Sequence, residues 1–282
     1  MQERIGWIVD ADVSGYFDRI DRTRLREVLR QRVNDGRILR LLGKWLRAGV
    51  MENGVLRHPE TGVVQGGVIS PVLANVFLQH ALDEWFERDV RPRREGRGVL
   101  MRFAEDCCIG CERQADAREI MAVLPKRFAR FGLTIHPEKT ALIAVGTPDA
   151  RPASAKGHGT VEFLGLPHAR AKSRRGFWVI KRRTASKRLR RTKQALWRWW
   201  RTNRHAPLNY QDQMLCLKLR GHFRYYGIRG NFRLLEEVRR FAEQAWRSWR
   251  SRRSSKRAMG WAKCQRLLQS YVLPTPKIVH PL

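Results

Sequence analysis

The sequence predicts an α+β fold, in which an antiparallel sheet covered by helices precedes an all-helical part. Three observations support this prediction. Residues 5–13 alternate between apolar and other side chains, which is typical of a strand. Two short apolar runs, Val99–Phe103 and Cys107–Cys111, are separated by three residues and indicate a hairpin. Apolar residues recur at helical spacing near the end of the chain, so we expect one domain over residues 1–181 and a second over residues 182–282.

The remaining elements of the first domain are taken in chain order. A helical pattern from Phe17 to Val33 follows the first strand, with Asp21 and Thr23 as candidate caps. Ser70, with Pro71 in the first turn, opens a long helical pattern. Further helices are expected at Ile38–Leu46, Ser70–Phe86 and Ala115–Phe131, a hairpin or loop at 50–64, a basic loop at 91–98, and further strands at 133–135, 141–145, 163–166 and 176–180.

The second domain is predicted to contain helices and a proline-rich tail. The helices are expected at 185–203, 209–226, 232–253 and 257–270. In the first of them, Leu189, Leu196 and Trp200 share one stripe and are expected to face the core. Four arginines of this helix are expected to face outward: Arg190, Arg191, Arg198 and Arg201.

The charge of the chain is strongly divided. The net charge is +31, yet residues 1–150 carry 24 basic and 21 acidic side chains. Residues 151–282 carry 33 basic and 5 acidic side chains and therefore need a polyanionic partner, for which nucleic acid is the usual candidate. Aromatic residues alternate with these arginines; they could stack on unpaired bases, but most are expected in the helical core.

Other classes of protein are disfavoured. No apolar run approaches the roughly 20 residues that a membrane span needs, and the N-terminus lacks the apolar core of a signal peptide. The five cysteines have no framework spacing and indicate reduced thiols in a cytosolic protein. Cys108 and Cys111 form a CxxC without a second pair, which favours a buried strand over a zinc site.

Two acidic pairs occur where a predicted element ends or turns. Asp10 and Asp12 lie at the exit of the first strand, and Glu105 and Asp106 lie at the tip of the predicted hairpin. Enzymes that transfer phosphoryl groups with two Mg²⁺ ions hold them with carboxylates from separate elements. Taken alone, the positions of Asp10, Asp18 and Asp21 favour helix caps and solvated turn residues instead.

Several motifs follow one another in a recognisable order. They are Asp12-Val13-Ser14-Gly15-Tyr16-Phe17-Asp18, the block from Gln65 to Asn75, Phe103-Ala104-Glu105-Asp106, Gly132-Leu133 with Lys139-Thr140, and Phe163-Leu164-Gly165. This order resembles that of the reverse transcriptases encoded by group II introns. The stretch from Leu219 to Gly227, followed by Asn231, resembles their maturase-type thumb. The resemblance implies a polymerase palm with an antiparallel sheet, followed by an all-α thumb.

The resemblance also implies roles for individual residues. The expected metal-binding groups are the Asp12, Glu105 and Asp106 carboxylates and the Val13 carbonyl, and the same three acids are the expected catalytic residues. Phe17, Gln65, Gly66 and Lys139 are expected at the nucleotide, Phe17 as the aromatic that excludes a 2′-hydroxyl. A core aromatic for Phe17 and a plain surface lysine for Lys139 are the alternatives. The expected RNA-binding arginines are Arg190, Arg191, Arg198, Arg201, Arg220 and Arg224.

Two departures from the family pattern bear on activity. The family's hairpin tip reads Tyr-Ala-Asp-Asp, whereas here Phe103 and Glu105 stand in the first and third positions. One extra methylene displaces the Glu105 carboxylate by about 1.5 Å. Only eleven residues precede Asp12, so we expect a truncated member without the N-terminal fingers region.

The expected function is therefore RNA-directed DNA synthesis with two Mg²⁺ ions, or Mn²⁺ in their place, at an activity reduced by these departures. The expected partners are intron RNA, an RNA template with a DNA primer, and dNTPs, with no membrane; a homodimer is left open. The alternative is a non-catalytic maturase-like protein that binds and folds intron RNA. A bacterial cytoplasmic location, with nucleoid association left open, is expected.

Overall fold

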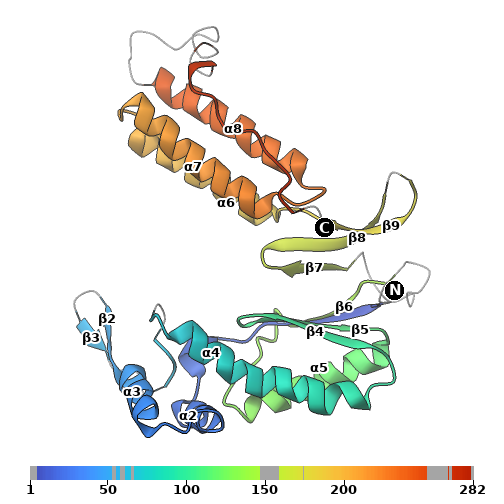
Figure 1. Cartoon of the computed structure of the whole chain (residues 1–282). Helices are drawn as coiled ribbons and strands as arrows, with labels where there is room; N and C mark the ends of the chain where they lie inside the picture. Colours follow the sequence, from blue (N-terminus) through green and yellow to red (C-terminus); the bar gives the residue numbers. More distant parts are fainter. Residues whose placement is uncertain are drawn as a thin grey trace. The chain divides into compact units, whose positions relative to one another are not determined.

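The computed structural model describes residues 5–52, 55–57, 61–64, 67–146, 159–173, 175–252, 266 and 269–280. The chain divides into two compact units, Met1–Leu164 and Gly165–Leu282, which are called here the N-terminal unit and the C-terminal unit (Figure 1). This division comes earlier than the change to helical sequence near residue 182, because a hairpin groups with the helices that follow it.

A four-stranded antiparallel sheet forms the centre of the N-terminal unit. Its strands, in spatial order, are β4 (Gly98–Phe103), β5 (Asp106–Cys111), β1 (Trp7–Ala11) and β6 (Ala141–Ala144). Central strand β1 pairs on both sides, so that Val9 lies between Ile109 of β5 and Leu142 of β6. Helices α4 (Ser70–Leu78) and α5 (Gln114–Ala129) lie along one face of this sheet (Figure 1).

The alternation of β1 divides its side chains as the sequence predicts. Val9, Ala11 and Val13 are buried in the core of the unit, while Asp10 and Asp12, on the opposite face, are only partly covered. The predicted buried strand is also confirmed, since every residue of β5 after Asp106 is buried.

The predicted helix over residues 17–33 is two helices, α1 (Tyr16–Arg19) and α2 (Arg22–Arg30). Ile20 has an extended backbone, and its carbonyl accepts a hydrogen bond from the Gly62 N–H at 2.9 Å. Asp21 then caps α2, as predicted, and accepts from the N–H groups of Thr23 and Arg24. The Gly62 N–H, from a segment about forty residues later, thus bonds a carbonyl that a continuous helix would use for its own hydrogen bonds.

The predicted helix at 70–86 extends further than expected. Helix α4 continues through the π-helical turns η1 (Gln79–Asp83) and η2 (Phe86–Val90) into a 3₁₀ turn, η3 (Arg91–Arg93). The segment at 133–135 forms an isolated bridge, Val13 to Ile135, instead of a strand. The other elements of the unit are α3 (Gly36–Arg47), β2 (Val50–Glu52), β3 (Val55–Arg57) and β7 (Thr160–Phe163).

The C-terminal unit contains a hairpin and three long helices. Strands β8 (Leu166–Lys172) and β9 (Trp178–Arg182) pair antiparallel. They are followed by α6 (Ser186–Asn203), α7 (Leu208–Tyr226) and α8 (Phe232–Ser251), which run side by side (Figure 1). The predicted stripe of α6 is confirmed, because Leu196 and Trp200 are buried and Leu189 packs against the same core.

Two further sequence predictions are a last helix near the end of the chain and the lack of a membrane span. The helix predicted at 257–270 lies almost entirely outside the described residues. In the part of the chain that the structure describes, no helix combines the length and the apolar character that a membrane crossing requires.

Candidate active site

The sheet register brings two of the predicted acids to neighbouring strand ends. Strand β1 pairs with β5 up to Ala11 and Cys107, so Asp12 and Asp106 are the next residues at that end of the ladder. Asp10 is opposite Cys108 on the same face, because every second residue of a strand points the same way. Burial raises the pKa of Asp10, and the charges of Asp106 and Asp12 raise it further. The sheet therefore gathers carboxylates on one face at this edge.

Lys139 is the cation of this site. Its Nζ lies 2.7 Å from Asp12 Oδ2, and this contact, with a further contribution from Asp106, raises the pKa of the Lys139 ammonium. The backbone places it there, since the His136 N–H donates to the Asp12 carbonyl at 2.8 Å. The Asp12 N–H in turn donates to Thr140 Oγ1 at 3.4 Å. The motif that ends in Lys139-Thr140 is thus bound directly to the strand end that carries Asp12.

The carbonyl of Val13 points away from this supporting segment. The Ser14 N–H donates to the Thr134 carbonyl, and the His136 N–H donates to the Asp12 carbonyl, on either side of the Val13–Ile135 bridge. In an antiparallel pair, bonds placed in this way leave the middle residue's own N–H and C=O on the opposite side of the strand. For Val13 that is the side on which β5 begins with Asp106.

Glu105 occupies the turn between β4 and β5. Phe103 pairs with Asp106, so Ala104 and Glu105 form a two-residue loop, in which Ala104 has a positive φ of 52°. The charge of Glu105 acts on Tyr16, whose pKa is raised mainly by burial. Among the residues that the structure describes, no three His, Cys, Asp or Glu side chains are grouped so that they could hold a metal ion together. The metal-binding roles of Asp12, Glu105, Asp106 and the Val13 carbonyl therefore all stay predictions.

Arg102 ties the hairpin tip to the helices, a role that the sequence did not reveal. Its Nε and Nη2 donate to the two Asp83 carboxylate oxygens at 2.7 and 2.6 Å. Its Nη1 donates to Asn75 Oδ1 at 2.9 Å and to the Ala104 carbonyl at 3.1 Å. The carboxylate of Asp83 raises the pKa of Arg102. This bidentate pair fixes the backbone directly before Glu105 and Asp106.

Of the predicted nucleotide-contacting residues, Phe17 lies on α1 and Lys139 lies beside Asp12. Phe17 is half-buried, and its ring packs edge to face on Tyr16 with ring centroids 5.5 Å apart. Gly62, which the sequence analysis overlooked, has a φ of 81°, and a Cβ there would lie 2.7 Å from the Phe17 carbonyl oxygen. Gln65 and Gly66 lie outside the described residues, so their role stays a prediction.

Comparison with known families decides the classification. A family model described as "Reverse transcriptase (RNA-dependent DNA polymerase)" matches residues 2–168, which is more than half of the chain. The chain belongs to the reverse transcriptase family. The site described above, with Asp12, Asp106 and Lys139, lies within the matched residues.

Curated relatives of this reverse transcriptase family member include a group II intron-encoded protein. Protein YkfC of Escherichia coli (strain K12) is 42% identical over 72 residues, 26% of this chain and 19% of that protein. The group II intron-encoded protein LtrA of Lactococcus lactis subsp. cremoris is 38% identical over 79 residues, 28% of this chain and 13% of LtrA. The predicted resemblance to the group II intron reverse transcriptases is thereby confirmed. The match spans less than a fifth of the length of either relative.

A solved structure supports the fold class. The apo telomerase of Candida Tropicalis superposes with a TM-score of 0.51 at 12% identity, covering 95% of this chain and 46% of that chain. Identity at that level supports the fold alone. The predicted α+β class, with its antiparallel sheet and helices, is confirmed for this reverse transcriptase family member.

The maturase-like motif in α7 divides into buried and exposed residues. Leu219 and Phe223 belong to the core of the C-terminal unit. Asn231 is fully buried; its Oδ1 accepts from the Thr184 N–H at 3.0 Å, and its Nδ2 donates to the Tyr226 carbonyl at 2.8 Å. The six predicted RNA-binding arginines are all exposed: Arg190, Arg191, Arg198, Arg201, Arg220 and Arg224. Much of the motif therefore stabilises the fold, while its arginines are available to a ligand.

Proposed function

We propose that this chain synthesises DNA on an RNA template through its N-terminal unit and binds RNA through its C-terminal unit. The observation that carries the proposal is the approach of Asp12 and Asp106 at the ends of β1 and β5, with Lys139 2.7 Å from Asp12. Carboxylates from separate strands beside a lysine ammonium suit the transfer of a nucleotide with release of pyrophosphate. The charge of the C-terminal unit supports RNA as the partner.

The donor groups at this edge suit a hard divalent cation. Asp12 already holds a cation, the Lys139 ammonium, and the carboxylate of Asp106 and the carbonyl of Val13 are directed to the same end of the sheet. Asp12, Asp106 and the Val13 carbonyl would hold Mg²⁺, or Mn²⁺, with Glu105 as a further ligand. When bound, such ions lower the pKa of an attacking hydroxyl and stabilise the departing pyrophosphate.

The chain's own residues have separate tasks in this reaction. The 3′-hydroxyl of a primer attacks the α-phosphorus of a dNTP, and the bond to pyrophosphate breaks. Asp12 and Asp106 orient the reacting groups, and Arg102 holds the backbone that carries Asp106. The Lys139 ammonium, kept protonated by Asp12, neutralises charge that develops on the triphosphate. Phe17, beside the Gly62 loop, would exclude a 2′-hydroxyl from the nucleotide.

A second candidate function is RNA binding and folding without synthesis. It is favoured because, in the described part of the chain, no three His, Cys, Asp or Glu side chains are grouped so that they could hold a metal ion together. It is also favoured by the charge of the C-terminal unit, whose residues 165–282 contain 31 Lys and Arg against 4 Asp and Glu. The two candidates differ in one measurable property, the extension of a primer.

The test is primer extension by the purified full chain. A labelled DNA primer annealed to an RNA template is incubated with dNTPs and Mg²⁺, and in parallel with Mn²⁺. We expect slow extension, because Glu105 replaces an aspartate, and a loss of about 100-fold or more in Asp12→Asn. The matched control is Asp89→Asn, the same change at an exposed position in η2. Its extension rate is expected to equal that of the wild type.

The outcomes separate the two candidates. Full activity of Asp12→Asn would refute the assignment of the site. A wild-type chain that binds RNA but extends no primer with either metal would refute synthesis and support the RNA-folding function. Binding of the same RNA is measured for every variant, because the Asp12→Asn change should leave the C-terminal unit and its RNA affinity intact.

A further inference from the structure

A groove runs between α6 and α8 on the C-terminal unit. Its volume is about 610 Å³, within the range of sites that bind small organic groups. Seven residues of α6 and one residue of α8 line it: Ser186, Leu189, Arg190, Lys193, Gln194, Trp197, Arg198 and Phe241. No acidic side chain is among them, and the lining combines aromatic rings with cations.

Aromatic rings from both helices line the groove. Trp197 and Phe241 are half-buried, with ring centroids 6.5 Å apart and planes inclined at 46°. Trp197 is held in place by Trp249, whose ring centroid is 5.2 Å away, and by the Arg252 guanidinium at 5.9 Å. A half-buried indole that is fixed in this way offers a flat surface to a planar ligand.

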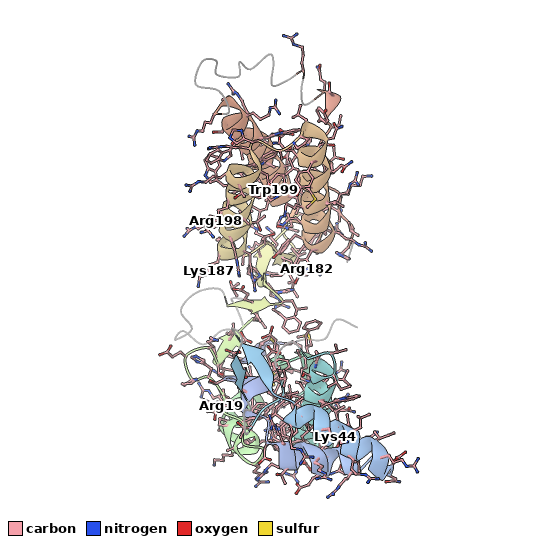
Figure 2. All side chains as sticks on the ribbon, turned by 90° about the vertical axis from the view of Figure 1, so that its left-hand side faces the viewer. Arg19, Lys44, Arg182, Lys187, Arg198 and Trp199 are labelled. Carbon is pink, nitrogen blue, oxygen red and sulfur yellow. The ribbon has the colours of Figure 1, made fainter. Side chains whose placement is uncertain are left out.

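The cations of the groove fall into two kinds. Lys193 Nζ lies 2.5 Å from Glu237 Oε1, so its charge is compensated within the protein. Arg190 and Arg198 are exposed, and neither makes an ion pair with a carboxylate in the described part of the chain. They are eight residues apart on α6, about 12 Å along the axis, on either side of Trp197 and Lys193. Figure 2 shows Lys187 on the same side of α6 as Arg198.

This combination selects a particular kind of ligand. Two uncompensated guanidinium groups require an anion, and phosphate is the anion that guanidinium binds with good geometry. The indole between them requires a planar group that is free to stack. A duplex keeps its base faces covered by neighbouring bases, whereas an unpaired strand presents both phosphates and base faces. A peptide of Asp and Glu alone would supply the charge but no ring.

We propose that the groove between α6 and α8 binds an unpaired stretch of RNA, with one base stacked on Trp197 and the neighbouring phosphates on Arg190 and Arg198. This inference rests on the RNA binding in the proposed function and adds to it a strand type and a residue for the base. Attraction by charge alone would not distinguish a single strand from a duplex in this way, nor a base from an abasic sugar.

The test uses the purified full chain and labelled 12-nucleotide RNAs. One is single-stranded oligouridine, one has the same length with three central abasic sites, and one is a 12-base-pair duplex. For the wild type we expect the abasic RNA to bind about tenfold more weakly than the intact single strand. Trp197→Leu keeps an apolar side chain and is expected to lose about tenfold for the intact strand. Its affinity for the duplex should change less than twofold.

The matched control is Trp199→Leu. Trp199 is also a half-buried tryptophan of α6, but it packs on Trp200 and under Lys218 and does not line the groove. We expect this variant to keep the wild-type ratio between single strand and duplex. Thermal melting confirms that both variants fold, and the abasic measurement on the wild type needs no variant at all.

The outcomes keep this inference apart from the proposed function. If the wild type binds no RNA, the proposed function and the groove both fail. If it binds RNA but treats intact, abasic and duplex RNA alike, only the groove assignment fails. Equal losses in Trp197→Leu and Trp199→Leu would also overturn it. So would competition by polyglutamate as strong as that by oligouridine, or tighter binding of the corresponding DNA strand.

Discussion

At the scale of single residues, Glu105 is the departure from the family pattern that we expect to slow primer extension. It forms a two-residue turn with Ala104, whose carbonyl accepts a hydrogen bond from Arg102. If the turn keeps this position, the extra methylene of glutamate displaces the carboxylate by about 1.5 Å from where an aspartate would place it. A displacement of about 1 Å at a reacting centre can cost on the order of 100-fold in rate.

We therefore predict that Glu105→Asp raises the rate of primer extension by about tenfold. The gain should be accompanied by a lower Mg²⁺ concentration at half-maximal rate, because the ligand geometry improves. Glu105→Gln is the control, since it keeps the length and removes the charge, and it should show no gain. A slower Glu105→Asp enzyme with unchanged thermal stability would contradict the geometric explanation.

At the scale of secondary-structure elements, Arg102 joins the β4–β5 hairpin to the helices on the sheet. Arg102 and Asp83 are largely covered, and their side chains retain 14% and 31% of their exposure. The Arg102 guanidinium donates hydrogen bonds to the Asp83 carboxylate and to Asn75 Oδ1. Removing it would take this donor away from both groups. It would also release the Ala104 carbonyl at the tip of the hairpin.

We predict that Arg102→Met lowers the free energy of unfolding by about 1–3 kcal/mol and slows primer extension. Arg102→Lys should recover part of the stability but little of the rate, because an ammonium cannot replace the bidentate contact. Denaturant unfolding and single-turnover extension measure the two effects. Arg97→Met, at an exposed position just before β4, is the matched control, and a similar loss there would argue against a specific role for Arg102.

How far the elements could be predicted depends on where their hydrogen-bond partners lie. The strands that carry Asp12 and Asp106 were predictable, because alternation is a local pattern. The break between α1 and α2 was not, because the Phe17 and Ile20 carbonyls are bound by Val63 and Gly62, more than forty residues later. The partner of Arg102 is likewise a residue of a different element, which no periodicity reveals.

At the scale of the whole molecule, the division of charge separates the two proposed activities. The site residues Asp12, Asp106 and Lys139 belong to the N-terminal unit, while the excess of arginine belongs to the C-terminal unit. This division of charge was predictable from composition alone. The exposure of the α6 arginines was predictable from helical spacing, because burial of the apolar stripe leaves them on the surface. The proposed RNA affinity should therefore survive the replacement of Asp12 and Asp106.

The final prediction concerns the salt dependence of RNA binding by the full chain. An interface with about six phosphates should give a slope of about −5 for log affinity against log salt, because each neutralised phosphate releases a condensed counterion. Changing Arg190, Arg191, Arg198 and Arg201 together to Gln should reduce the slope to about −2 if all four contact phosphate.

The matched control changes Arg26, Arg30, Arg37 and Arg40, four exposed arginines of α2 and α3, to Gln. This control removes the same net charge and should leave the slope near −5. Filter binding across a salt series measures both, and equal flattening in the two quadruple variants would mean that total charge, not the surface of α6, determines RNA affinity.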